Sequence, residues 1–354
     1  MNKNRLFSIL RLGFAVLSLF VFALTFACSS GGTGSPPPPT GDYLKTPDAK
    51  KGNIVAYHPE WESIPTDAQL DRLTHIVLFS ITPNNHRVPL PSGGWANNIS
   101  GVVSRAHAKG VKVIIALGGW DRTGSFAESV KPANRQTFIK NIMVLVNQYN
   151  LDGVDIDWEY PNTSEEVTNF EGFMVDLKAA LGNIRRLSFA IGAQYQPSKY
   201  TDATYNALDA LHLMTYDGQG DGGRSHHADM AWSKSVVDTW VSSGKLTKEK
   251  IFYGVPFYGR PSSGWDVEDT YTKIISSNQA TLSQTNIKTN HNVGSWTGTI
   301  YYDGVPQVKE KTKYAWDKDI GGIMIWETGQ DVAATSQYSL LNAIYAETER
   351  LKGQ

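Results

Sequence analysis

Three acidic residues alternate along one short apolar segment, and their spacing points to acid–base chemistry. They are Asp155, Asp157 and Glu159, within residues 152–159. In a β-strand, side chains alternate between the two faces, so all three point one way and the apolar residues between them point the other way. Buried like charges repel, and burial disfavours the ionised form. A purely structural role would need a bound metal or cationic partners, and the neighbouring predicted strand ends carry no histidine for a metal.

The crowding of these carboxyls has a chemical use. Interacting carboxyls titrate as a coupled set, which keeps one of them protonated near neutral pH, as a general acid must be. Glu159 comes last, at the C-terminal end of its strand, where barrels of parallel strands place their active sites. We therefore predict that Glu159 is the proton donor. Asp157 and Asp155, which precede it on the same strand face, are expected to influence its protonation.

The rest of the chain supplies the elements that must position this strand. Short apolar runs rich in β-branched residues alternate with longer amphipathic stretches, as in proteins with buried parallel strands. The predicted strands are 53–57, 75–81, 111–117, 153–159, 187–193, 211–216, 251–257 and 322–326, and the predicted helices include 135–149, 164–181, 230–242 and 335–351. Eight such units predict an α/β fold, a (β/α)8 TIM barrel. An open doubly wound sheet is the rival, but no glycine-rich phosphate loop follows the first strand.

The acidic segment resembles the fourth-strand signature of the family 18 glycoside hydrolases, the chitinase family. That signature, Asp-Gly-x-Asp-x-Asp-x-Glu, is matched at every fixed position by residues 152–159, and the resemblance covers roughly residues 52–351. It implies a TIM barrel that hydrolyses β-linked N-acetylglucosamine polymers, with no cofactor and no metal. By this resemblance the catalytic residues are Asp155, Asp157, Glu159 and Tyr216.

Other strand ends match further positions of the family. The resemblance implies that the substrate site is lined by Asp217, Met214, Tyr57, Trp326, Tyr258 and Arg260. Tyr216 would hold the acetamido oxygen of the substrate, and Trp326 would form a hydrophobic floor under the reacting sugar. The sequence departs from the family at Ala116, where a serine is usual, and at Ala56, where a glycine is usual.

Strand geometry limits the mechanism. Asp157 and Glu159 lie side by side on one strand, so they cannot flank the scissile bond as the two carboxyls of most retaining glycosidases do. The substrate can supply the nucleophile itself, because its 2-acetamido oxygen can attack the anomeric carbon and form an oxazolinium ion. The prediction is retaining cleavage of β-1,4-linked N-acetylglucosamine in chitin or chitooligosaccharides. Two alternatives stay open: an endo-β-N-acetylglucosaminidase acting on the chitobiose core of N-glycans, and a non-catalytic carbohydrate-binding lectin on the same barrel.

The spacing of the last strands sets an expectation about the cleft. Many members of this family carry an α+β insertion after the seventh strand. Only about 60 residues separate Arg260 from the eighth predicted strand, and these must also contain a helix. We expect a reduced or absent insertion and a shallower, more open cleft.

The start of the chain predicts export. Residues 1–27 combine a basic beginning with an apolar run, which is typical of a signal peptide. Cys28 follows, which resembles a bacterial lipoprotein signal and predicts lipidation, although Thr25 and Phe26 depart from the usual pattern. Residues 28–51 form a linker rich in Gly, Ser and Pro, and residues 52–354 are expected to form the catalytic domain. The expected location is the bacterial cell envelope, lipid-anchored at the outer membrane or cell surface, or otherwise secretion.

Composition narrows the partners. The net charge is −1, so no electrostatic field favours nucleic acid, and the expected partners are a polymer or oligomer of N-acetylglucosamine and a membrane reached through the lipid. The single cysteine excludes an intramolecular disulfide. Four tryptophans are candidates for stacking on outer sugars: Trp61, Trp120, Trp232 and Trp265. His226 and His227 are expected to be loop residues and not metal ligands.

Overall fold

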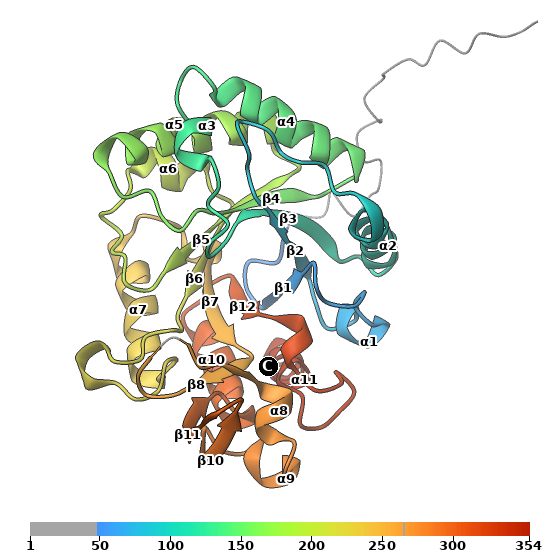
Figure 1. Ribbon diagram of the computed structural model, residues 1–354, viewed down its shortest axis with the longest axis vertical. Helices are drawn as coiled ribbons and strands as arrows, with labels where there is room; N and C mark the ends of the chain where they lie inside the picture. Colours follow the sequence, from blue (N-terminus) through green and yellow to red (C-terminus); the bar gives the residue numbers. More distant parts are fainter. Residues whose placement is uncertain (1–47, 265) are drawn as a thin grey trace, which may run out of the picture. The chain divides into compact units, whose positions relative to one another are not determined.

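A computed structural model describes residues 48–264 and 266–354 (Figure 1). Eight parallel strands close into a barrel in the order β1-β12-β7-β6-β5-β4-β3-β2. They are β1 (Asn53–Pro59), β2 (His75–Ile81), β3 (Lys112–Gly118), β4 (Gly153–Asp157), β5 (Arg186–Gly192), β6 (Ala210–Met214), β7 (Ile251–Pro256) and β12 (Gly322–Trp326). The predicted TIM barrel is confirmed, and each predicted strand boundary lies within two residues of the observed one.

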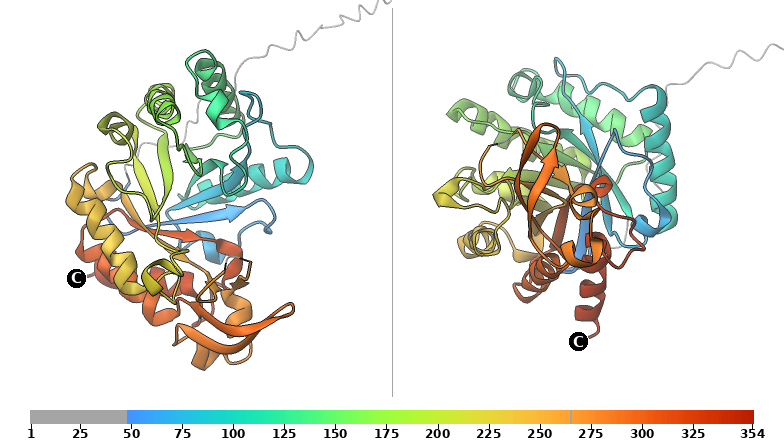
Figure 2. Two further views of the ribbon diagram at one scale, coloured as in Figure 1. Left: turned by 60° about the vertical axis from the view of Figure 1, so that its left-hand side comes forward. Right: turned by 60° about the horizontal axis from the view of Figure 1, so that its bottom comes forward.

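Helices surround the strands on the outside of the barrel (Figures 1 and 2). They are α1 (Asp67–Leu70), α2 (Gly93–Ala108), α3 (Phe126–Ser129), α4 (Arg135–Gln148), α5 (Ser164–Leu181), α6 (Asp202–Ala207), α7 (Met230–Ser243), α10 (Val305–Asp317) and α11 (Leu340–Lys352). Local sequence sets several of their ends; for example, Thr163 and Glu166 form a capping box at the start of α5. In the described part of the chain, no helix is both long and apolar enough to span a bilayer.

The last helix corrects a prediction, because α11 begins at Leu340 and not at residue 335. The Ser339 side chain caps the helix by accepting a hydrogen bond from the backbone N–H of Asn342. Asp331 accepts hydrogen bonds from the backbone N–H groups of Leu340 and Leu341. These bonds satisfy the N–H groups of the first turn, so the preceding residues remain a loop.

The barrel has two apolar layers. The outer layer lies between the strands and the helices. It includes Val154 and Ile156 from β4 and Trp158, which directly follows β4. The inner layer fills the barrel and includes Tyr57, Phe79 and seven other buried residues. The apolar residues of the acidic segment therefore face the helices, and its carboxyls face the barrel interior, as the period of two predicts.

A small insertion follows β7. It is an antiparallel sheet in the order β10-β11-β8-β9. Its elements are β8 (Tyr258–Arg260), β9 (Asp269–Thr270), α8 (Tyr271–Ile275), α9 (Gln279–Leu282), β10 (Ile287–Val293) and β11 (Trp296–Tyr302), and Figure 2 shows its orange hairpin beside the barrel. The sequence predicted that this insertion is either reduced or absent, and the structure excludes its absence. The hairpin carries mostly polar, partly exposed residues, so it lacks the apolar pattern that marks the barrel strands.

The segment before β1 is held at the N-terminal end of the barrel. Asp48 accepts hydrogen bonds from the Lys112 ammonium (2.5 Å) and from Arg186, and it lies 3.1 Å from Nε2 of His75. Its three partners are the first residues of β2, β3 and β5. Asp48 therefore lies at the opposite end of the barrel from Glu159.

A buried ion pair links α10 to the residue that follows β11. Lys311 is fully buried; its ammonium donates to Asp303 (2.6 Å) and to the backbone carbonyl of Ala228 (2.9 Å). Removing one partner of such a pair leaves an uncompensated buried charge, so we expect Lys311→Ala to lower the free energy of unfolding by about 3–5 kcal/mol. Chemical denaturation measures this change.

Lys313 is the matched control on the same helix. It pairs with Asp317, and both side chains are about half exposed. Exposed pairs contribute about 1 kcal/mol or less, so Lys313→Ala should change stability little. Equal losses for the two variants would show that the buried pair has no special role.

Candidate active site

Asp155 is the fully buried carboxyl at the base of the site. It accepts hydrogen bonds from the hydroxyls of Tyr57 (2.8 Å) and Ser188 (2.5 Å). Nδ1 of His212 lies 2.9 Å from the Tyr57 hydroxyl oxygen and 3.3 Å from Asp155 Oδ1. These contacts hold the Asp155 carboxyl in a fixed position at the base of the cluster.

Asp157 is buried beside it in a different environment. Burial, with the charges of Glu159 and Asp155, raises the pKa of Asp157 well above its usual range. Its Oδ1 atom is buried without a hydrogen-bond partner among the described residues. Asp157 is therefore the carboxyl that holds a proton while the substrate site is empty.

Two glycines let the third strand approach this pair. A Cβ atom at Gly118 would lie 2.2 Å from the backbone oxygen of Asp157, and one at Gly119 would lie 2.2 Å from the Phe79 ring. Both glycines also adopt positive φ angles, of 100° and 110°. The Gly119 N–H donates to the Asp157 carbonyl at 2.6 Å. The glycines therefore allow the end of β3 to pack closely against β4 and the Phe79 ring.

Glu159 follows the end of β4 and is the outermost of the three carboxyls. Burial raises the pKa of Glu159 to about 7, with further increases from the charges of Asp217 and Asp121. Hydrogen bonds from the Tyr160 hydroxyl and the Trp120 backbone oppose this rise. Glu159 can therefore hold a proton at neutral pH and release it to a bound group.

Asp217 is held as an anion on the opposite side of the site. It accepts hydrogen bonds from the Tyr258 hydroxyl (2.7 Å) and from Nε of Arg260 (2.6 Å), and Nδ1 of His227 lies 3.3 Å away. Burial would raise the pKa of Asp217, but His227 and Arg260 outweigh it and lower the pKa to about 2. Arg260 is itself held by Glu268 at 2.8 Å.

Aromatic rings form the floor between these groups. The Trp326 ring lies 4.7 Å from the Phe79 ring and 5.6 Å from the Tyr57 ring. Tyr216 lies edge-on to Tyr258 at 6.1 Å. A flat apolar floor bordered by carboxyls suits a sugar ring, whose C–H face is apolar while its hydroxyls are polar.

The structure brings all ten predicted site residues of the barrel together. Asp155, Asp157 and Glu159 come from β4 and the turn after it, and Tyr57 and Trp326 come from β1 and β12. The other five come from β6, the turn after it, and β8: Met214, Tyr216, Asp217, Tyr258 and Arg260. Met214, Tyr216 and Trp326 pack against the inner apolar layer.

Sequence reasoning missed several partners of these residues. His212 and Ser188 hydrogen-bond within the Tyr57–Asp155 group. The signal for His212 was available, because it lies two residues before Met214 and hence on the same strand face. Phe79, to which the sequence assigned no role, packs under Trp326. His227 does lie in a loop, as expected, but it is fully buried and contacts Asp217.

The candidate sugar-stacking tryptophans differ in exposure. Trp120 is 73% exposed. Trp61 is 56% exposed, but the Arg122 guanidinium lies over its ring at 5.5 Å. Trp232 packs partly buried against the core, and Arg224 lies over its ring. Trp265, like Cys28 and the rest of residues 1–47, lies outside the described residues.

No group of three His, Cys, Asp or Glu side chains suited to a metal ion occurs among residues 48–264 and 266–354. The arrangement that is present is a protonatable carboxyl above a paired set of carboxyls, facing an aromatic floor at the C-terminal end of a TIM barrel. This arrangement defines the class of the protein as a glycoside hydrolase.

Comparison with known proteins identifies the family. The family profile described as "Glycosyl hydrolases family 18" matches residues 53–331, and the chain belongs to this family. The structure is similar to a GH18 chitinase, ChiB, from the chitin utilization locus of Flavobacterium johnsoniae, with 27% identity, a TM-score of 0.71 and coverage of 86% of this chain and 96% of the other. A chitinase from Bacteroides thetaiotaomicron gives 25% identity, a TM-score of 0.71 and coverage of 84% and 96%.

A curated relative is much longer than this chain. The protein named "Probable chitinase 10" from Drosophila melanogaster is 27% identical over 371 aligned positions. The match covers 84% of this chain but 16% of the relative. The likeness therefore concerns a small part of that protein and not its whole length.

Proposed function

We propose that the protein hydrolyses β-1,4-linked N-acetylglucosamine in chitin or chitooligosaccharides, with retention of configuration. The observation that carries this proposal is the position of Glu159 directly after the strand end that holds the buried Asp157, with both carboxyls on one side of the site. Across the site, Asp217 is engaged by Tyr258 and Arg260, which makes its carboxylate a poor nucleophile. The nucleophile is then the acetamido oxygen of the substrate, as in the substrate-assisted class of glycosidases.

Each residue has a role in this proposal. Glu159 protonates the leaving oxygen and later, as a base, activates the water that opens the oxazolinium ion. Asp157 transfers its proton to the Asp155 carboxylate and turns toward the acetamide N–H of the substrate. As an anion it then stabilises the positive charge of the oxazolinium ion. The Tyr216 hydroxyl donates a hydrogen bond to the acetamido oxygen and orients this oxygen for attack on the anomeric carbon. The Trp326 ring packs against the reacting sugar.

Support for the substrate comes from the named relatives. The Flavobacterium and Bacteroides proteins, at 27% and 25% identity, are both described as chitinases. An N-acetyl group is what the proposed mechanism requires, because without it the substrate offers no internal nucleophile. Chitin meets this requirement at every residue of the polymer.

Product analysis tests the proposal directly. The protein is incubated with chitin hexasaccharide, with the matching glucose hexasaccharide, and with an N-glycosylated glycoprotein, and products are identified by mass spectrometry. We expect short chitooligosaccharides from the first substrate and no products from the second. NMR spectra recorded early in the reaction should show the new reducing end in the β configuration. Release of an intact N-glycan with the chitin hexasaccharide uncut would move the assignment to an endo-β-N-acetylglucosaminidase. Binding without cleavage of either would favour a lectin.

The pH dependence follows from the raised pKa of Glu159. The donor must be protonated, and burial raises its pKa to about 7, so the active form is present below pH 7 and is lost as the pH rises through that value. On the chitin hexasaccharide, kcat/KM should fall about tenfold per pH unit above this pKa. A profile whose alkaline limb begins near pH 5 would contradict the donor role in this environment.

We further propose that the protein is exported and lipid-anchored to the bacterial cell envelope through Cys28. The support is the basic and apolar start of the chain followed by the cysteine. Metabolic labelling with a palmitate analogue, compared between the natural protein and Cys28→Ser, tests it. Equal labelling of both would overturn the anchor and leave export through an ordinary signal peptide.

A further inference from the structure

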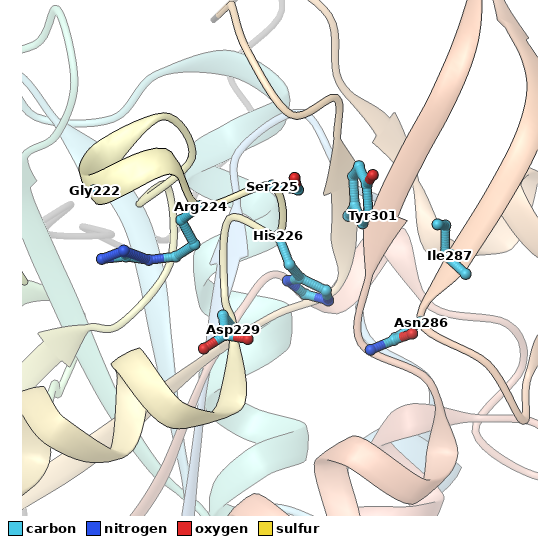
Figure 3. Close-up of a pocket in the computed structure, with 8 residues that line it drawn as sticks. All are labelled: Gly222, Arg224, Ser225, His226, Asp229, Asn286, Ile287 and Tyr301. Atoms are coloured by element: carbon cyan, nitrogen blue, oxygen red, sulfur yellow. The ribbon is translucent and has the colours of Figure 1, made fainter.

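A second concavity lies apart from the acidic strand, between the loop that follows β6 and the insertion sheet (Figure 3). Its volume is about 450 Å³, within the range of pockets that bind small ligands. The loop side contributes Gly222, Arg224, Ser225, His226 and Asp229, and the insertion side contributes Asn286, Ile287 and Tyr301. None of these residues belongs to the active site described above.

The lining combines the Tyr301 ring with several polar side chains, and one of these, Arg224, lies over the Trp232 ring. Asp229 uses its Oδ1 atom to cap α7 by accepting from the Trp232 N–H at 3.0 Å, which leaves the other oxygen available. Among the described residues, the side chains of Ser225 and Asn286 make no hydrogen bond. Tyr301 supplies a partly exposed ring. An aromatic face beside amide, hydroxyl and carboxylate groups suits a neutral polyol ring.

The wall of the pocket is fixed by His226. Its Nε2 atom donates to the Tyr302 carbonyl at 2.9 Å, and its Nδ1 atom accepts from the Ala228 N–H at 3.0 Å. Both ring nitrogens are therefore used by the neutral imidazole, and the ring joins the loop to β11. This wall is formed before any ligand arrives, which reduces the cost of binding.

The same wall separates the pocket from the active site. His226 stacks on His227 at 5.7 Å with the rings nearly parallel. His227 in turn contacts Asp217 through Nδ1. The pocket thus lies on the far side of the histidine pair from Asp217, so a ligand there does not occupy the site of cleavage.

We propose that this pocket is an auxiliary sugar-binding site that holds one or two N-acetylglucosamine units of the polymer outside the catalytic site. The inference rests on the proposed function. One face of a pyranose ring would lie on Tyr301, with its hydroxyl and acetamide groups bonded to Asn286, Ser225 and Asp229. Two weak sites on one polymer surface raise the apparent affinity for long or insoluble chains and leave short soluble substrates unaffected.

Calorimetry with chitobiose on the full-length Glu159→Gln variant tests the pocket. We expect two binding sites per chain, and one after the further change Tyr301→Ala. Tyr301→Phe is the matched control, because it keeps the ring and should keep both sites. Thermal melting shows whether either variant has lost its fold; if Tyr301→Ala melts early, Asn286→Ala, which leaves the ring in place, is used instead.

Chitin binding and turnover provide the second measurement. In otherwise natural protein, Tyr301→Ala should bind insoluble chitin at least about tenfold more weakly, with kcat/KM on a soluble trisaccharide unchanged. A single site in the parent variant, or unchanged binding of insoluble chitin by Tyr301→Ala, would overturn the inference. If the hexasaccharide is cut and only one site is found, the pocket inference alone fails. If the hexasaccharide is neither cut nor bound, the proposed substrate fails and the pocket inference fails with it.

Discussion

Replacing Glu159 by Gln should reduce kcat on the chitin hexasaccharide by about 10²–10⁴-fold, the usual contribution of general acid catalysis. Glutamine keeps the shape of the side chain but cannot donate a proton to the leaving oxygen. The floor formed by Trp326 and the Tyr57–Asp155 group is untouched, so the affinity for the oligosaccharide should change little. Steady-state kinetics gives the first quantity, and calorimetry on the inactive variant gives the second.

Glu327 provides a demanding control for this experiment. It directly follows Trp326 and is almost fully buried, and burial raises its pKa to about 7, as it does for Glu159. However, its carboxylate accepts the Gly329 N–H at 2.7 Å and caps a short turn. Glu327→Gln keeps that acceptor and should leave kcat nearly unchanged. A large loss in Glu327→Gln with little loss in Glu159→Gln would reassign the acid.

Asp157→Asn is expected to reduce kcat/KM by about 10²–10³-fold, the cost of removing one preorganised group that stabilises the transition state. The carboxyl starts protonated because it is buried beside Asp155 and Glu159. It is useful because it can become negative when the oxazolinium charge develops. Asparagine can still form a hydrogen bond to the acetamide, but it cannot acquire that charge. The loss should therefore fall on kcat more than on KM.

Asp121→Asn is the control for a general effect of negative charge. Asp121 contributes to the raised pKa of Glu159 but lies outside the buried cluster. We expect its replacement to lower the pKa of Glu159, which moves the alkaline limb of the profile to lower pH, with kcat within about threefold at the optimum. If Asp157→Asn behaved in the same way, charge alone would explain the effect, and the substrate-assisted role of Asp157 would be withdrawn.

The barrel and the position of the three carboxyls in it could be predicted because their signals are local. The period of two fixes which way Asp155, Asp157 and Glu159 point, and the strand end fixes where Glu159 emerges. Tyr216 and Trp326 came instead from the resemblance of other strand ends to the family, because no local pattern indicates their roles. Each of these inferences needs the order of residues along one strand and nothing about distant ones.

The features that were missed depend on contacts between distant segments. Ser188 reads as an ordinary strand residue until β5 pairs with β4 and brings it to Asp155. His227 is ten residues from Asp217 along a glycine-rich loop, and only the fold of that loop buries it against the carboxylate. The insertion hairpin packs through a few residues, such as Ile300, that are too sparse to give an apolar pattern.

The contacts of Asp48 separate the part of the barrel that sets its closure from the part that carries the chemistry. The strand starts that bind Asp48 lie at the end of the barrel opposite Glu159. A change at Asp48 would therefore weaken the barrel where three of its strands begin and leave the geometry of the carboxyl cluster in place. In this fold, stability and catalysis can thus be altered independently of each other.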